Sequence, residues 1–296
     1  MTPLKEYLAI ARVDNWVGWL FSLGIGCVFL TLPSPALITI LFFAFSFATA
    51  GIFILNQYFD REDDKENKEK SVLPVASGRI TPRTALILSL SLMTSSLLLS
   101  FSISMGVFSL FLVYLALWTA YSAPPFRLKA VPAMDFVVSG VGAGLLPFLI
   151  GLGSWYQQNI NVLLILIVGL SLTLAHSSGH ILQALGDYES DEKQAVQTFV
   201  VKFGRKKAII IMGVLSIIAG ILPLIYTARG FLPTNLFPVL FLPLPFCLPI
   251  VWKYITLTSK PTTQNALSLQ KATRKYGVIV MVLVVSCLLA GKILGL

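Results

Sequence analysis

Charged side chains are scarce in this chain, and their scarcity excludes most classes of soluble protein. Only 12% of its 296 residues are Asp, Glu, Lys or Arg, whereas 56% are hydrophobic and the mean hydropathy is +0.83. Soluble domains carry about 25% charged residues. Several runs of more than about 17 residues contain no charge, and a helix of that length can cross a bilayer. The composition therefore indicates a membrane protein with several spans.

The apolar runs also lack the alternation of polar and apolar residues that a membrane-spanning barrel requires. Each strand of such a barrel turns one face to lipid and the other to the lumen, so its residues alternate. Unbroken apolar runs instead favour helices, whose backbone hydrogen bonds are satisfied within each segment. We therefore predict an all-α, polytopic membrane fold.

Cysteine is rare as well, and its placement excludes a cysteine-based metal site. Cys27, Cys247 and Cys287 are the three cysteines, and each lies in a different apolar run without metal-site spacing. We interpret them as small hydrophobic side chains. Neither the HExxH zinc motif nor the GxGD string of intramembrane aspartyl proteases occurs in the chain.

Nine apolar runs are long enough to be spans, and the basic residues predict their orientation. Of 22 Lys and Arg residues, all except Arg229 and Lys292 lie in the N-terminal stretch, in alternate loops or at the span ends that adjoin these loops, together with all 13 acidic residues. This positive-inside bias predicts a plasma-membrane protein whose N-terminus and charged loops are cytoplasmic and whose C-terminus is on the opposite side. The first run is too long for the core of a cleaved signal peptide. The predicted spans are residues 16–32, 36–56, 84–104, 106–122, 135–152, 162–186, 208–226, 235–255 and 276–294.

Two acidic segments with the same plan follow the second and the sixth run. In each, polar residues recur at intervals of three or four, which would place them on one face of a helix. This similarity suggests two related halves of one domain, at about 1–130 and 131–296. The first set is Asn56, Asp60 and Asp64, and the second is His176, His180, Gln183, Asp187 and Asp191.

Aspartates spaced one helical turn apart indicate a site for a hard cation. Such like charges repel each other unless a cation lies between them, and Mg²⁺ prefers a few carboxylates together with the oxygen atoms of substrate phosphates. The two aspartate pairs could hold Mg²⁺ over a diphosphate. A solvated charge run is the alternative, and we expect it for the neighbouring Glu62, Asp63 and Glu66.

Basic and aromatic residues accompany the carboxylates. In the segment YSAPPFRLK, two prolines end the fourth run and place Arg127 and Lys129 near the membrane, where they could bind phosphate oxygens or simply anchor the loop. Tyr121 is a candidate for a cation–π contact. Lys68 and Lys70 add positive charge beside the first acidic segment.

The histidines of HSSGH, His176 and His180, are one helical turn apart and could bind a transition metal. No cysteine or third ligand lies next to them. We therefore favour a role in lining a polar cavity or in hydrogen bonds between helices.

Together these segments resemble the UbiA superfamily of intramembrane prenyltransferases. The family's first motif, NxxxDxxxD, is matched by Asn56, Asp60 and Asp64, and its second, DxxxD, by Asp187 and Asp191. The segment YSAPPFRLK resembles the loop after the family's fourth helix, and LPVASGRIT resembles its LPSGRIS segment.

The resemblance implies about nine helices around a central cavity that opens to the cytoplasmic side, in a single domain over residues 1–296. It implies a Mg²⁺ cofactor and transfer of a polyprenyl group from a prenyl diphosphate to a lipophilic or aromatic acceptor, such as a quinone precursor, a lipid, chlorophyllide or a carotenoid. The implied site consists of Asn56, Asp60, Asp64, Asp187 and Asp191 at the metal, Lys68, Lys70, Arg127, Lys129 and Gln183 at the diphosphate, and Tyr121 beside the allylic cation.

Three places depart from the family pattern, and a second class of function stays open. Gln57 follows Asn56 where many members have aspartate, and Gln183 stands where asparagine often occurs. Ser71 and Val72 replace the arginine–proline pair that often precedes the LPSG segment. A transporter or ion-coupled carrier is the alternative function, because carboxylates and broken helices also mark ion pathways. The net charge of +9 fits loops that face anionic lipid, so we expect neither a nucleic-acid partner nor an obligate protein partner.

Overall fold

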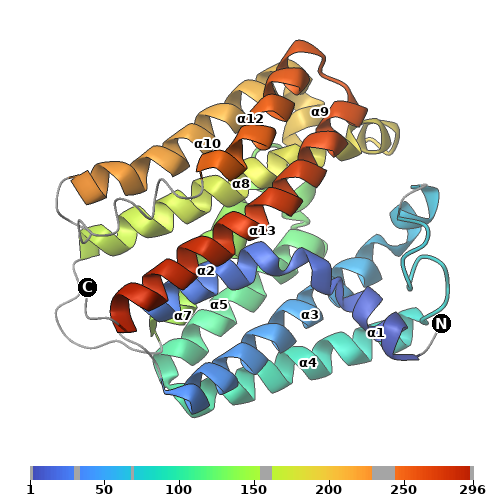
Figure 1. Ribbon diagram of the computed structural model, residues 1–296. Coiled ribbons are helices and arrows are strands. Elements are labelled where there is room, and N and C mark those ends of the chain that lie inside the picture. The colour runs from blue at the N-terminus through green and yellow to red at the C-terminus, as the bar shows by residue number, and fades with distance from the viewer. Residues whose placement is uncertain (1–2, 30–33, 68–69, 154–161, 229–243, 294–296) are drawn as a thin grey trace. The chain divides into compact units, whose positions relative to one another are not determined.

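The apolar runs form helices throughout the part of the chain that the computed structural model describes, which is residues 3–29, 34–67, 70–153, 162–228 and 244–293 (Figure 1). No strand occurs within these ranges, as the sequence predicts. The helices are α1 (Pro3–Ala11), α2 (Val17–Phe29), α3 (Pro35–Glu66), α4 (Pro82–Ile103), α5 (Met105–Ser122), α6 (Met134–Gly140), α7 (Leu146–Gly153), α8 (Val162–Lys193), α9 (Phe199–Phe203), α10 (Arg205–Ala228), α12 (Leu244–Ser259) and α13 (Thr263–Ile293). Three short elements, η1 (Val13–Asn15), η2 (Leu128–Ala130) and the π-helix η3 (Val141–Leu145), complete the set.

Seven of the described helical stretches are long and apolar enough to cross a membrane. The α6–η3–α7 segment counts as one of them, and α2 is a shorter apolar helix. The chain is therefore an all-helical, multi-pass membrane protein. The predicted span at 235–255 lies partly outside the described residues.

Three helices are longer than the hydropathy pattern predicts. Helix α3 continues to Glu66 and α8 to Lys193, and α13 already begins at Thr263. The extensions are polar, so hydropathy alone assigns them to loops. Residues with good helix propensity and pairs such as Lys65 Nζ with Glu62 Oε2, at 2.8 Å, allow a helix to continue beyond the apolar segment. Both acidic segments therefore lie on helices.

The chain divides into two compact units, of which unit 1 comprises residues 1–17 and 33–128. Helix α3 packs along α4 and against α5, and α1 covers part of α3. Proline at the first turn and a hydroxyl N-cap start both long helices: Ser34 Oγ accepts a hydrogen bond from Leu37 N, and Thr81 Oγ1 from Thr84 N. Gln57, the departure from the family motif, is buried and donates to the carbonyl of Ile10, so it fastens α1 to α3.

Unit 2 comprises residues 18–32 and 129–296, and α8 lies at its centre. Helices α6, α10 and α13 all pack against α8. His176 on α8 forms a 3.0 Å hydrogen bond with Ser22 on α2, which is the interhelical role that the sequence favours for this residue. No third metal-ligating side chain joins the histidines in the part of the chain that is described.

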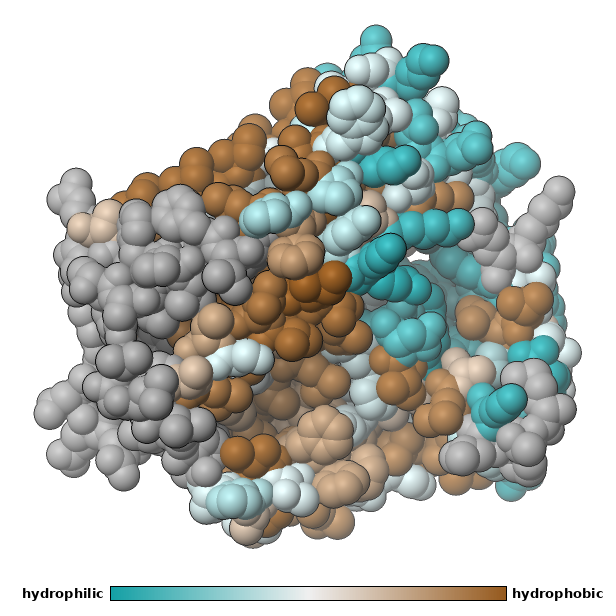
Figure 2. Space-filling model, in the orientation of Figure 1, coloured by the Kyte–Doolittle hydropathy of each residue, from teal (hydrophilic) through white to brown (hydrophobic). Residues whose placement is uncertain are grey.

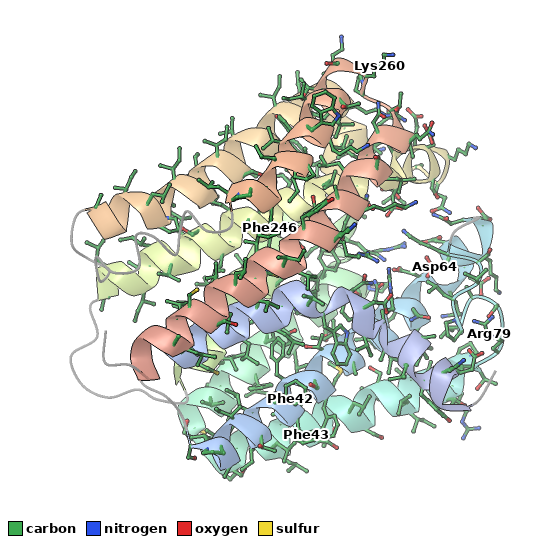
Figure 3. All side chains as sticks on the ribbon, viewed as in Figure 1. Phe42, Phe43, Asp64, Arg79, Phe246 and Lys260 are labelled. Carbon is green, nitrogen blue, oxygen red and sulfur yellow. The ribbon has the colours of Figure 1, made fainter. Side chains whose placement is uncertain are left out.

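The outer surface of the helices is hydrophobic along their length, as contact with lipid requires. Ile210, Ile217 and Ile225 on α10 are exposed, and Figure 2 shows brown side chains along this helix. In unit 1, Phe42 and Phe43 are about half exposed on α3. Figure 3 shows both near one end of α3 and Asp64 at the other, so the apolar and the acidic parts of this helix are well separated.

Candidate active site

The first acidic segment forms the last turns of α3 in unit 1. Asp60 and Asp64 are each only 8% exposed, and their spacing places them on one face of the helix. Burial of two carboxylates is costly unless partners compensate their charge. These two side chains are therefore not the solvated charges of an ordinary loop.

Asn56 connects the carboxylates of α3 to α5. Its Nδ2 donates a 2.7 Å hydrogen bond to Oδ2 of Asp60 and a 3.3 Å hydrogen bond to the hydroxyl oxygen of Ser122 at the end of α5. Ser122 is a further candidate site residue, which the sequence interpretation missed. It is the serine of YSAPPFRLK, and its small hydroxyl gives no signal apart from its place in that segment.

Arg127 reaches Asp60 and the neighbouring Asp63 from the loop after α5. Its Nη2 donates a hydrogen bond to Oδ2 of Asp63 and lies 3.6 Å from Oδ1 of Asp60. The expectation that Asp63 is a solvated neighbour is wrong, because Asp63 is paired with this guanidinium. Glu62, by contrast, is largely exposed and pairs with Lys65 and Arg61.

The second acidic segment forms the last turns of α8 in unit 2. Gln183 is exposed on this helix, and Asp187 and Asp191 are partly buried one turn apart. The carbonyl of Asp191 accepts a hydrogen bond from Val196 N at 2.9 Å, which turns the chain back after the helix. The predicted spacing of the second motif is thus realised on a helix.

Arg205 contacts the end of α8 at two residues, Tyr188 and Glu189, which lie between the two aspartates. Its guanidinium lies 4.2 Å from the ring centroid of Tyr188 and donates a 2.7 Å hydrogen bond to Glu189. It also donates to the carbonyl of Pro261 and to Thr263 Oγ1. One planar cation therefore connects α8 with the segment between α12 and α13.

We expect Arg205→Lys to lower the free energy of unfolding by about 1–3 kcal/mol, because one ammonium group cannot stack and make three separate contacts. Denaturant unfolding in detergent micelles would measure this. The matched control is Lys206→Ala, at an exposed neighbouring residue, which should leave stability within about 0.5 kcal/mol. Equal stability of Arg205→Lys and the native chain would contradict the role of the guanidinium.

Asp135 is a second polar residue that the sequence interpretation missed. It is 1% exposed at the start of α6, and its Oδ2 accepts a 2.9 Å hydrogen bond from the backbone N–H of Phe199. It thereby fixes α9, whose N-cap is Thr198. In the sequence Asp135 is a lone acid before an apolar run, and its partner is a backbone group, so no pattern reveals the pair.

The remaining candidate residues have varied surroundings. Lys68 lies outside the described residues. Lys70 lies in the turn after α3, where its backbone N–H donates to Asn67, and Lys129 lies on η2. Tyr121 is buried, and its ring meets that of Trp118 edge-on at a centroid distance of 5.0 Å.

The donor set of α3 fits a Mg²⁺ ion that is also bound by substrate. Magnesium takes oxygen ligands and is usually held by one or two carboxylates together with phosphate oxygens and water. Two buried carboxylates and a neighbouring amide supply such donors. Within the described ranges, no three His, Cys, Asp or Glu side chains converge into a metal site by themselves.

An apolar groove of about 530 Å³ lies between α4 and α5 of unit 1. Leu90, Met93 and Leu97 line it from α4, and Leu112 and Leu115 from α5. The segment from Ala123 to Phe126, directly before Arg127 in the chain, also lines the groove. The groove is suited to hydrocarbon of either a lipid or a prenyl chain.

Comparison with known proteins supplies the family. The UbiA prenyltransferase family matches residues 17–273, which is most of the chain and includes both acidic segments. The chain belongs to the UbiA prenyltransferase family. The family prediction from the sequence motifs is thereby confirmed.

Similar proteins with established names include one from a plant and one from an archaeon. A 2-acylphloroglucinol 4-prenyltransferase of Humulus lupulus is 34% identical over 170 residues, which are 54% of this chain and 39% of that protein. The chain thus matches about two fifths of the plant protein's length. A digeranylgeranylglyceryl phosphate synthase of Thermococcus gammatolerans is 28% identical over 233 residues, which cover 74% of this chain and 78% of that enzyme.

A solved UbiA homolog from Archaeoglobus fulgidus, bound to GPP and Mg²⁺, has the same fold. The two chains superpose with a TM-score of 0.75 at 23% sequence identity, over 97% of this chain and 99% of the homolog. The UbiA fold therefore extends over nearly the whole of the present chain, including the helices that follow the second acidic segment.

Proposed function

We propose that this UbiA-family chain is a Mg²⁺-dependent intramembrane prenyltransferase that moves a polyprenyl group from a prenyl diphosphate to a lipophilic or aromatic acceptor. The observation that carries the proposal is the buried Asp60–Asp64 pair with Arg127 beside it. One similar protein is named for 2-acylphloroglucinol and another for digeranylgeranylglyceryl phosphate, and the solved homolog was bound to GPP and Mg²⁺. These names support the donor class and a range of acceptors.

Residues of both acidic segments serve the metal and the diphosphate in this proposal. The bound metal would neutralise the negative charge that develops on the departing diphosphate. Arg127 binds phosphate oxygens through the donors of its planar guanidinium. The proposed ligands of the metal are Asn56, Asp60, Asp64, Asp187 and Asp191, and Lys68, Lys70, Lys129 and Gln183 are the further residues proposed for the diphosphate.

The transfer needs a charged leaving group in water-poor surroundings. The bond from C1 of the prenyl group to the diphosphate oxygen breaks, and its electron pair leaves with the diphosphate. A nucleophilic carbon or oxygen of the acceptor then bonds to C1, and the acceptor loses a proton. Apolar helices exclude water from the allylic cation, and the ring of Tyr121 stabilises it through its π-electrons.

The membrane arrangement belongs to the same proposal. We propose a single domain of nine spans around a cavity that opens to the cytoplasmic side of the plasma membrane, built from two related halves. The N-terminus is cytoplasmic and the C-terminus lies on the opposite side. The distribution of Lys and Arg over alternate loops supports this orientation.

A transfer assay with the purified full-length protein tests the proposed function. The protein is supplied with prenyl diphosphates of several lengths and a panel of aromatic and lipid acceptors, with Mg²⁺ or with EDTA. We expect a prenylated product and free diphosphate that depend on Mg²⁺. Substrate flux across liposomes without any product would instead favour the transporter. Lipid extracts from cells with and without the gene would then identify the acceptor.

A further inference from the structure

We propose that Asp63 is a positioning residue. It holds the guanidinium of Arg127 beside Asp60 but prevents it from forming a hydrogen bond to Asp60, which is a proposed metal ligand. The inference rests on the proposed function, because it assigns a role within the same metal–diphosphate site. Asp63 is not one of the residues of the NxxxDxxxD pattern. It follows Asp60 by three positions on α3 and therefore lies near the same side of the helix.

The two carboxylates share one nitrogen of Arg127 in different ways. Nη2 donates a hydrogen bond to Oδ2 of Asp63, whereas the distance from Nη2 to Oδ1 of Asp60 is 3.6 Å. The second contact is an ion pair but is too long for a hydrogen bond. Asp63 thus accepts the hydrogen bond from Nη2. The positive charge of Arg127 stays near Asp60, but the guanidinium forms no hydrogen bond with Asp60 through this nitrogen.

The loop holds Arg127 in an unusual backbone conformation. Its φ angle is +38°, in the left-handed region that non-glycine residues seldom adopt, and its N–H donates a 2.9 Å hydrogen bond to the carbonyl of Ala123. Such a conformation persists where the surroundings fix it. The pair with Asp63 is a contact that fixes this loop to α3.

The rest of the guanidinium is available to an anion. Arginine carries five N–H donors in one plane, and neither Nε nor Nη1 of Arg127 donates a hydrogen bond within the described part of the chain. The side chain is 38% exposed. An arginine anchored by one nitrogen and open at the others can bind phosphate oxygens through two parallel bonds.

Loss of the Asp63 charge would release Arg127 toward Asp60, the nearest remaining carboxylate. The guanidinium would then compete with Mg²⁺ for Asp60 and would no longer be aimed at the diphosphate. We therefore expect Asp63→Asn to weaken binding of Mg²⁺–pyrophosphate by roughly tenfold, the size of one charge-assisted hydrogen bond. The KM for the prenyl diphosphate should rise by about the same factor, with kcat changed by less than about threefold.

The test measures binding of inorganic pyrophosphate to the full-length protein in nanodiscs by titration calorimetry, over a series of Mg²⁺ concentrations. The variants are Asp63→Asn, Asp63→Glu, Arg127→Gln and the double variant Asp63→Asn with Arg127→Gln. Asp63→Glu should recover most of the affinity. Asp63→Asn should have no further effect once Arg127 is glutamine, because Asp63 acts through Arg127. Glu62→Gln, at the exposed neighbour, is the matched control and should bind as the native chain does.

Two outcomes would overturn the role of Asp63. One is native pyrophosphate affinity in Asp63→Asn, even with a lower melting temperature, because that would leave a purely structural ion pair. The other is an additive loss in the double variant. Absence of prenyl transfer with every acceptor would refute the proposed function, whereas the binding pattern described above would still support the positioning of Arg127.

Discussion

Replacement of Asp60 by asparagine is expected to lower the rate of prenyl transfer by about 10²- to 10³-fold, the usual cost of removing one charge-stabilising group from an active site. Asparagine keeps an oxygen that can accept the hydrogen bond from Asn56, so the end of α3 should remain folded. It has no negative charge, however, and the metal loses a carboxylate. Asp187→Asn on α8 is expected to have an effect of the same order.

Single-turnover rates with a labelled prenyl diphosphate would measure this loss, and thermal unfolding in detergent would verify the fold. The apparent affinity for Mg²⁺ in the presence of pyrophosphate provides a second measurement that does not depend on the acceptor. Glu66→Gln is a suitable control, because this exposed residue ends the same helix. Transfer at the native rate by Asp60→Asn would remove Asp60 from the metal site.

The positions of Asn56, Asp60 and Asp64 on one helix face follow from the sequence, because local spacing determines which side chains share a face. The hydrogen bond from Asn56 to Asp60, four residues later, agrees with that prediction, because it joins two side chains on the same face. Hydropathy, on the other hand, placed the end of the helix near residue 56, whereas α3 continues to Glu66. A bilayer limits the apolar segment, but it does not limit the helix that leaves it.

The roles of Asp63 and Asp135 could not be predicted in the same way. Glu62, Asp63 and Asp64 are three consecutive acids, and composition does not tell which one meets a cation from elsewhere in the chain. The partner of Asp63 is Arg127, 64 residues later in the sequence. A pairing over that distance depends on how α3 and α5 pack, which local patterns do not encode.

Glycines are the second kind of feature whose importance depends on packing. Helices α2 and α7 of unit 2 approach each other at Gly26 and Gly151. A Cβ atom at Gly26 would collide with the carbonyl oxygen of Phe148 and lie 3.0 Å from the nitrogen of Leu152. A Cβ atom at Gly151 would likewise meet the backbone of α2, at Leu23 and Cys27. Membrane helices commonly use small residues in this way, because close backbone contact supplies much of their association energy.

Gly26→Ala is therefore expected to lower the free energy of unfolding by about 1–3 kcal/mol, since backbone atoms cannot turn aside as a flexible side chain can. Gly24→Ala is a matched control on the same helix, where an added Cβ atom has no neighbour within 4 Å. That variant should keep its stability within about 0.5 kcal/mol or gain slightly, because alanine favours a helix more than glycine does. Denaturant titration in mixed micelles compares the two. Equal stabilities would mean that α2 and α7 can separate at no cost, and that their close contact does not hold unit 2 together.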